Sequence, residues 1–406
     1  MSLRWILAGS CATTLLLILC NWDGIDFQLQ RPSACIGTQE ALAAFSRSRE
    51  LQQESWPERQ GFFNRSSFLI RAYADPRVFP PRVRVVAFRE PGLSCELRCN
   101  LGGLLDAQMS CERCNLGDRP GQIDGYFLDC PMDPFPRRPP VIRISFRGEC
   151  AELGIVYPEQ RWTFGACLGP LHRSSEVPEA ECAEKLRRHI AYLRYAGVDK
   201  VLVYAYNASS SDEKVLTSLG SLIRWLPWPK LDKLEANEFV GSRRMHYMGQ
   251  TTLLADCLMQ NAAANAAFTS FSDTDEFFWL NGSDSTGWLL DWLRRRSSEE
   301  SAFSFPHQAA GPIRFDAGGQ AHVKLLSGDW LDGINLEERT KVIVRPMQTE
   351  MAVTHFVKAL ISGRAVSLPR SVGYLVHMRH NWAKVENLSN WENPEFNRLI
   401  AKAIAF

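Results

Sequence analysis

Two carboxylates stand one residue apart in the middle of the chain, in the run Asp273-Thr274-Asp275. The stretch before them, residues 266–271, is mostly apolar and predicts a buried strand. Two acidic side chains at the end of a strand suit a hard divalent cation and leave coordination positions for phosphate oxygens. Acidic pairs of this spacing are also common in solvated turns. The position after a strand is what favours a metal site here.

Two histidines and two basic residues in the last quarter of the chain are candidates to complete such a site. His377 lies in the run 374–378, where alternation predicts a strand. A neutral imidazole is a good metal ligand, so His377 is the first candidate and His355 the second, a core histidine being the alternative for both. Lys341 and Arg345 are four apart on a predicted strand and would point to one side. There they could neutralise a diphosphate, the alternative being a surface basic pair.

The second half of the chain alternates predicted helices and strands. This pattern indicates a mostly parallel α/β sheet flanked by helices. The expected elements are a strand at 162–168, a helix from Pro178 to about Ala196, strands at 200–206 and 222–225, a helix at 249–264, and the strand before Asp273. Gln250 and Asp256 lie on the last helix, where we expect packing and capping, with a site role as the alternative. Glycine-rich dinucleotide and phosphate-binding loops are lacking, so that chemistry is not indicated.

The N-terminal residues predict a targeting segment. Arg4 is followed by an uncharged run over 5–20. A helix over this run would span about 24 Å, short against a bilayer core of roughly 30 Å, but thin early-secretory membranes tolerate such spans. The preceding positive charge predicts an inside N-terminus. We expect a signal anchor over 1–22, with a cleaved signal peptide as the alternative. Both deliver the body to the secretory lumen.

Sequons and cysteines agree with that compartment. N-glycosylation sequons begin at Asn64, Asn207, Asn281 and Asn387. Most of the chain's 12 cysteines fall between Cys95 and Cys257, and an oxidising lumen would pair most of them. The spacing of Cys95, Cys99, Cys111 and Cys114 resembles a zinc site, but we expect disulfides in a small β-rich region. Cys257 is expected to be a buried free thiol on a core helix.

Chain length, net charge and a proline cluster indicate how the chain divides into domains. The 406 residues suffice for one large domain and a smaller one. A net charge of +1 gives no support to a nucleic-acid partner. A proline cluster over 131–140 marks a linker or domain edge. We therefore expect an anchor at 1–22, a stem at 23–64, a small cysteine-rich β domain at 65–140, and the main domain at 141–400.

The chain from Phe68 to Arg379 resembles glycosyltransferase family 92. The blocks that carry the resemblance are 73–77 (Tyr-Ala-Asp-Pro-Arg), the helix-strand unit 192–204, Gln250 with Asp256-Cys257, the Asp273–Phe277 core, 341–346 before His355, and 375–379. Their order and spacing are more specific than any single block. The resemblance implies a GT-A-type fold, dependence on Mn2+ or Mg2+, and a lumenal catalytic domain anchored in the Golgi membrane as a single-pass type II protein. It also implies transfer of galactose from UDP-galactose to a glycan acceptor, with inversion.

The resemblance to GT-A enzymes also implies roles for individual residues. Asp275 would ligate the metal directly, and Asp273 would contact the ribose or a water-bridged group. Glu276 would support the ligands or cap the turn, a structural ion pair being the alternative. An inverting enzyme needs a carboxylate base, and spacing does not choose among Asp329, Asp332, Glu337 and Glu338. The nucleobase is expected near the carboxyl ends of the strands at 162–168 and 200–206, with Arg173 and Asn207 as loop candidates.

One departure from the family leaves other functions open. Met378 stands where the family usually has Tyr, so a catalytically impaired lumenal glycan-binding protein is one alternative. A metal-dependent phosphohydrolase of the haloacid dehalogenase type is another. Such an enzyme would want Thr or Val two residues after Asp275, where Phe277 stands.

Overall fold

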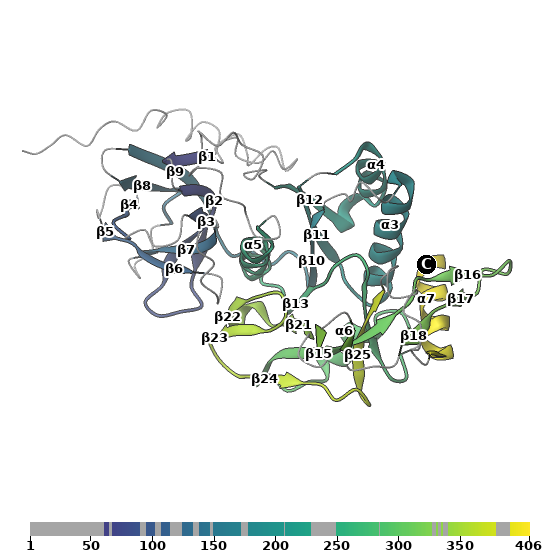
Figure 1. The fold of residues 1–406 in the computed structure, drawn as a ribbon. Helices are drawn as coiled ribbons and strands as arrows, with labels where there is room; N and C mark the ends of the chain where they lie inside the picture. The colour runs from purple at the N-terminus through teal and green to yellow at the C-terminus, as the bar shows by residue number, and fades with distance from the viewer. Residues whose placement is uncertain are drawn as a thin grey trace, which may run out of the picture. The chain divides into compact units, whose positions relative to one another are not determined.

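The computed structural model (Figure 1) describes most of the chain from residue 61 onward. The described residues are 61–64, 67–89, 95–101, 107–113, 124–132, 138–146, 149–171, 178–206, 208–228, 249–283, 285–326, 330–331, 334–335, 340–378 and 390–406. Several predictions therefore lie outside the described residues: the anchor at 1–22, nearly all of the stem, Cys114, Arg173, Asn207, Asp329, Asp332, Glu337, Glu338 and Asn387. Within the described part, no helix is both long and apolar enough to cross a membrane.

The first sheet has the strand order β5-β4-β8-β9-β2-β3-β7-β6, and β1 pairs with β2. Its strands are β1 (Gly61–Asn64), β2 (Ser67–Asp75), β3 (Arg82–Arg89), β4 (Arg98–Asn100), β5 (Ala107–Gln108), β6 (Ser110–Arg113), β7 (Asp124–Pro131), β8 (Val141–Phe146) and β9 (Glu149–Val156). Its pairs are antiparallel except for β2 with β9. Alternate residues of β3 enter two different cores: Val83 and Val85 pack on one side, and Val86 and Phe88 on the other.

The proline cluster does not end this sheet. β8 and β9 follow it in the chain and pair with each other, and β8 pairs with β4 while β9 pairs with β2. The boundary expected at residue 140 therefore falls inside the sheet, which continues to Val156. The physical reason is that the prolines mark a connection between strands rather than an edge between cores. All described residues belong to one compact unit, Gln39–Phe406.

Disulfides confirm one prediction about cysteine chemistry and correct another. Cys95 bonds Cys111 and Cys99 bonds Cys130, so these cysteines are disulfide partners and not zinc ligands. The prediction of a free thiol at Cys257 is wrong, because Cys257 bonds Cys167. The helix α5 (Gln250–Ala263) packs on the strand that carries Cys167, with 6.1 Å between the Cα atoms of the two cysteines.

The second sheet has the order β12-β11-β10-β13-β21-β15-β18-β26, and β14, β24 and β25 pair off this path. Its strands are β10 (Phe164–Leu171), β11 (Lys200–Ala205), β12 (Ile223–Pro227), β13 (Phe268–Phe271), β14 (Glu276–Leu280), β15 (Glu300–Ala310), β18 (Lys324–Leu326), β21 (Thr340–Val344), β24 (Arg364–Ser367), β25 (Gly373–Met378) and β26 (Asn390–Glu392). The short two-stranded pairs are β16 (Arg314–Phe315) with β17 (Ala321–His322), β19 (Trp330–Leu331) with β20 (Ile334–Asn335), and β22 (Thr349–Ala352) with β23 (Val357–Leu360).

The mixed α/β class is confirmed, but the sheet is less parallel than predicted. β12, β11, β10 and β13 run parallel, as the alternating helix-strand pattern indicates. Beyond β13 the pairing is mixed: β21 is antiparallel to both β13 and β15, and β25 is parallel to β15. Parallel neighbours require crossover connections of a dozen or more residues. The turn after Phe271 is much shorter, so the chain leaves the parallel pattern there.

Helices cover this second sheet (Figure 1), and two of them, α3 and α5, lie close to their predicted positions. They are α3 (Glu179–Tyr195), α4 (Ser210–Ser218), α5 (Gln250–Ala263), α6 (Trp288–Arg294) and α7 (Pro394–Ala405), with the 3-10 turns η1 (Gly220–Leu222) and η4 (Pro346–Gln348). Gly197 follows the end of α3 with φ of 104°, a backbone region that favours glycine. Leu186 and Ile190 of α3 pack in the same core as Phe396 of α7. Leu253 of α5 packs in the other core, together with residues of the first sheet.

A buried carboxylate joins α5 to both sheets. Asp256 is fully buried and accepts hydrogen bonds from the hydroxyls of Tyr73 and Tyr204, at 2.6 and 2.7 Å. A guanidinium nitrogen of Arg71 lies 3.3 Å from the same carboxylate. Burial raises the pKa of both tyrosines well above the ordinary value, so they remain hydroxyl donors. Asp256 is thus a packing residue that holds β2 and β11 against one helix.

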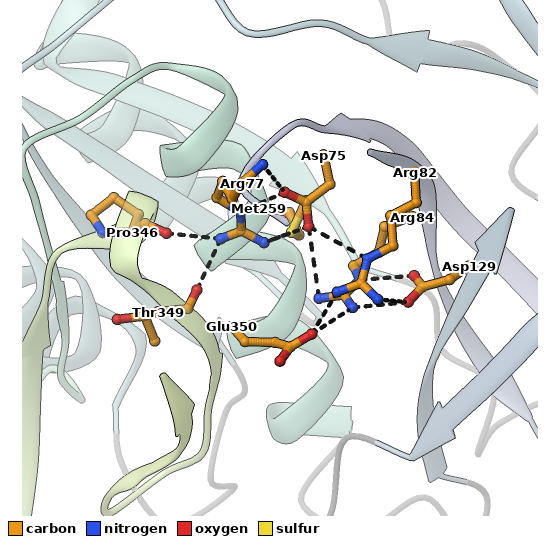
Figure 2. A network of polar contacts seen from close by, with 9 residues as sticks. All are labelled: Asp75, Arg77, Arg82, Arg84, Asp129, Met259, Pro346, Thr349 and Glu350. Atoms are coloured by element: carbon orange, nitrogen blue, oxygen red, sulfur yellow. Dashed lines mark hydrogen bonds and ion pairs between the residues drawn. The ribbon is translucent and has the colours of Figure 1, made fainter. Parts of the chain in front are cut away.

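A second polar network fastens the first sheet to the segment that follows β21 (Figure 2). Asp75 accepts from the Nε of Arg77 at 2.6 Å, and Arg77 also donates to the backbone carbonyls of Pro346 and Thr349. Arg84 is fully buried and pairs with Asp129 at 2.8 Å; the ion pairs of the network extend to Arg82 and Glu350. Burial alone would raise the pKa of Asp75, but hydrogen bonds and charge from Arg77 lower it. The block 73–77 therefore connects the two halves of the chain.

The burial of Asp256 predicts a large effect of its removal. Asp256→Ala leaves the guanidinium of Arg71 and two tyrosine hydroxyls without their buried acceptor. We expect a loss of about 3–5 kcal/mol of folding free energy. The shift of the urea unfolding midpoint measures it. Asp291→Ala is the matched control, because Asp291 is 54% exposed on α6 and pairs with the exposed Arg294; it should cost about 0–1 kcal/mol. Equal effects of the two substitutions would contradict this structural role.

Candidate active site

The acidic pair occupies the turn between β13 and β14. The backbone N–H of Asp273 donates to Oε2 of Glu276 at 2.9 Å, and the N–H of Glu276 donates to the carbonyl of Asp273 at 3.1 Å. The carbonyl of Asp275 accepts from the N–H of Met378 on β25 at 2.8 Å. Backbone and side-chain bonds thus fix the turn on both sides, and the carboxylates of Asp273 and Asp275 stay partly exposed, at 41% and 38%.

A buried ammonium neutralises part of this acidic cluster. Nζ of Lys341, on β21, lies 2.9 Å from Asp273 and 3.0 Å from Glu276. Burial alone would lower the pKa of Lys341, but the two carboxylates outweigh burial and raise it. The other oxygen of Asp273 accepts from the amide of Gln250, at the first turn of α5, at 3.2 Å. Asp273 is therefore held through both carboxylate oxygens.

Asp275 and His377 converge at the open side of the turn. Nε2 of His377 lies 3.5 Å from Oδ2 of Asp275, and Nδ1 lies 3.8 Å from Oε1 of the buried Glu276. The strand register explains this, because His377 of β25 is the direct partner of Glu276 on β14. A carboxylate oxygen and an imidazole nitrogen at this separation, one of them solvent-accessible, fit a divalent cation such as Mn2+ or Mg2+.

Two histidines at the site lie on elements other than the acidic turn. His189 of α3 is fully buried and shares a hydrogen bond of 3.3 Å with the hydroxyl of Ser272, the residue before the acidic pair. Burial lowers its pKa to about 4, against a smaller opposing effect of the acidic cluster, so the ring is neutral at pH 7. His307 of β15 lies 3.8 Å from Glu276. Sequence reasoning missed both, because each histidine stands alone in its element: His189 follows two arginines on an amphipathic helix, and His307 follows the mostly apolar start of β15.

The remaining predicted residues, His355 and Arg345, do not contact the acidic pair in the described structure, although the ring of His355 lies 6.1 Å from that of His307. Nδ1 of His355 is 3.0 Å from the carbonyl of Thr340, at the start of β21. Arg345 donates to the carbonyl of Glu300 at 2.9 Å, and its guanidinium stacks on the ring of Phe268. Arg345 does not point to the same side as Lys341. The strand β21 ends at Val344, and the side chain of Arg345, just past that end, donates to the backbone carbonyl of Glu300 instead. Among the described contacts, none links Arg345 or His355 to the acidic pair.

Comparison with known proteins identifies the family. Residues 163–403, more than half of the chain and nearly all of the segment from β10 to α7, match the model of glycosyltransferase family 92. The chain belongs to this family and is a glycosyltransferase, as the order of the sequence blocks predicts. No curated protein sequence shows a significant match.

Three solved structures that match the chain have low TM-scores. One described as a mycobacterial protein has a TM-score of 0.22 and 14% identity over 36% of this chain, and the match spans only 41% of that chain. UDP-glucose pyrophosphorylase in complex with UDP-glucose has a TM-score of 0.24 and 8% identity, over 60% of this chain and 98% of that one. Its apo form has a TM-score of 0.24 and 7% identity, over 60% and 97%. Similarities of this size carry no information about function.

The neutral His189 predicts a pH dependence of stability. Its pKa falls from 6.5 in the unfolded chain to about 4 in the folded one, so below pH 6.5 the unfolded state binds the extra proton. The contribution of His189 to stability therefore decreases as the pH falls, by about 2 kcal/mol between pH 7 and pH 5. Urea unfolding at both pH values, for wild type and His189→Gln, isolates this term. An identical pH dependence of the two proteins would contradict it.

Proposed function

We propose that this glycosyltransferase is a metal-dependent, inverting enzyme that transfers a sugar from a nucleotide-sugar donor to a glycan hydroxyl. Family membership supports glycosyl transfer. The convergence of Asp275 and His377 beside the Asp273–Lys341 pair is the observation that supports metal-assisted donor binding. UDP-galactose as donor, inversion, and a lumenal Golgi location on an N-terminal membrane anchor are the properties expected from the resemblance to the family.

The charge of the site fits one divalent cation. Asp273, Asp275 and Glu276 contribute three negative charges, and the ammonium of Lys341 removes one. The remaining two match a single Mn2+ or Mg2+ bound by Asp275 and His377. When bound, this ion would act as a Lewis acid that stabilises the negative charge of the departing diphosphate.

The protein's own groups orient the donor. Asp273 keeps 41% of its side chain exposed while Gln250 and Lys341 fix both oxygens, so it presents a rigid acceptor for a donor hydroxyl such as that of the ribose. Lys341 remains cationic because its pKa is raised. An inverting reaction also needs a base that takes the proton of the acceptor hydroxyl. Asp329, Asp332, Glu337 and Glu338, in the chain before β21, remain the candidates.

The substitution at Met378 leaves the described geometry intact. Met378 contacts Asp275 through its backbone N–H, which any residue other than proline provides, and its side chain is buried in the core. This favours an active enzyme over a catalytically impaired glycan-binding protein. A phosphohydrolase is disfavoured by the family match. Phe277, at the position where that class needs Thr or Val, packs in the core against the rings of His189 and Tyr192.

A donor assay tests the proposal. The purified full-length chain is incubated with a panel of UDP-sugars, and release of UDP is followed with Mn2+ and after chelation. We expect release from one donor, UDP-galactose, only with metal. Asp275→Asn should lower the rate about 10²-fold or more, because it removes the charged ligand. The exposed Asp291→Asn is the control and should keep the wild-type rate. Equal release after chelation, or full activity of Asp275→Asn, would contradict a metal at this site.

A further inference from the structure

Neighbouring strands of the second sheet present polar residues on one shared face. Glu276 of β14 is the direct partner of His377 on β25. His377 is the partner of Ala309 on β15, and His307 stands two residues before Ala309, so His307 and His377 are diagonal neighbours on the same face. Lys341 of β21 is the partner of Phe305, which stands two residues before His307. Four chain segments distant in sequence thus align Lys341, His307, His377 and Glu276 in one polar row.

The contacts in this row converge on the ring of His377. The rings of His307 and His377 are 5.2 Å apart and nearly perpendicular, at 83°. Nε2 of His307 and Nδ1 of His377 each lie 3.8 Å from the same oxygen, Oε1 of Glu276. The outer nitrogen of His377, Nε2, is then the one that lies beside Asp275.

Glu276, His307 and His377 have the composition of a metal site, since one ligand atom from each lies within 4.8 Å of the others. Charge and burial argue against a metal among them. The second oxygen of Glu276 already pairs with the ammonium of Lys341 at 3.0 Å, and a further cation on Glu276 would be repelled by it. Glu276 and His307 are each only 1% exposed, whereas the side chain of Asp275 is 38% exposed. An incoming ion therefore meets Asp275 first; His377 is itself only 6% exposed, and its Nε2 lies 3.5 Å from Oδ2 of Asp275.

We propose that His307, together with Glu276, is a positioning residue for the metal ligand His377. His307 and Glu276 contact the His377 imidazole on the side of its ring away from Asp275, so that Nε2 faces Asp275. Hydrogen-bonded partners fix the orientation of a ligating histidine, and their removal weakens metal binding by roughly 10–100-fold. His307 acts on the ring of His377 by packing, and we take the same range for its removal. The inference rests on the proposed function, because it takes Asp275 and His377 as the metal ligands.

Metal affinity tests the role of His307 without an activity assay. Titration of the full chain with Mn2+, with free Mn2+ read by electron paramagnetic resonance, gives a Kd. His307→Ala should weaken it roughly 10–100-fold. His307→Gln places an amide near the former Nε2 and should recover part of that loss. His322→Ala is the control, since His322 is half-exposed on β17 and contacts Asp316 and Glu392, and it should keep the wild-type Kd.

Pulsed electron paramagnetic resonance of the wild-type Mn2+ complex gives a second measurement that needs no variant. We expect the signature of one coordinated imidazole, that of His377. Two coordinated imidazoles would overturn the inference, because His307 would then be a ligand itself. A wild-type Kd in both His307 variants would overturn it as well, while the metal site stands. Failure of wild type to bind Mn2+ would overturn the proposed function and this inference together, and so is distinguishable from the other outcomes.

Discussion

The ammonium of Lys341 is the charge on which the site depends. A buried cation is tolerated only when it is paired and hydrogen-bonded, and here its partners are Asp273 and Glu276. This pairing fixes β21 against the turn between β13 and β14, and it occupies two of the three carboxylates of the acidic run. Among the residues that the structure describes, no lysine or arginine forms an ion pair with Asp275. Asp275 beside His377 is thus the carboxylate left for a ligand, because Lys341 pairs with the other two carboxylates of the run.

Contacts outside the site fix the elements that carry Asp273 and Lys341. α5 brings Gln250 to Asp273 at its first turn, and its Asp256 is tied to tyrosines from both sheets. The segment after β21 is held by Arg77 and by the ion pairs of Glu350, which belong to the network of the first sheet. The family model matches only from residue 163 onward. Nevertheless, β2 and β3 of the first sheet contact both α5 and the segment after β21. The first sheet therefore belongs to the framework of the enzyme.

Local patterns in the sequence predict much of this fold. The strand before Asp273 and the helices α3 and α5 lie within one or two residues of their predicted bounds, because their periodicity and end signals are properties of a short segment. Such local patterns do not predict which distant segments of the chain pair with each other. The sheet is less parallel than predicted, the first sheet continues past residue 140, and Cys257 is a disulfide partner. In each case the deciding contact comes from a strand elsewhere in the chain.

The same distinction holds for the site. Asp273, Asp275, Lys341 and His377 could be selected from residue type and neighbourhood, and the structure brings these four together. His307 could not, because its proximity to His377 depends on the register of β15 with β25. Arg345, four residues after Lys341, is expected to point to the same side of the strand. It lies past the end of β21, however, and donates to the backbone carbonyl of Glu300. Spacing predicts a shared face only while the strand continues.

A crystal of the chain grown with Mn2+ and UDP would locate the metal through its anomalous signal. We expect one manganese peak, bound by Oδ2 of Asp275, Nε2 of His377 and the diphosphate oxygens. A peak enclosed by Glu276 and His307, or UDP bound with no manganese beside Asp275, would contradict it.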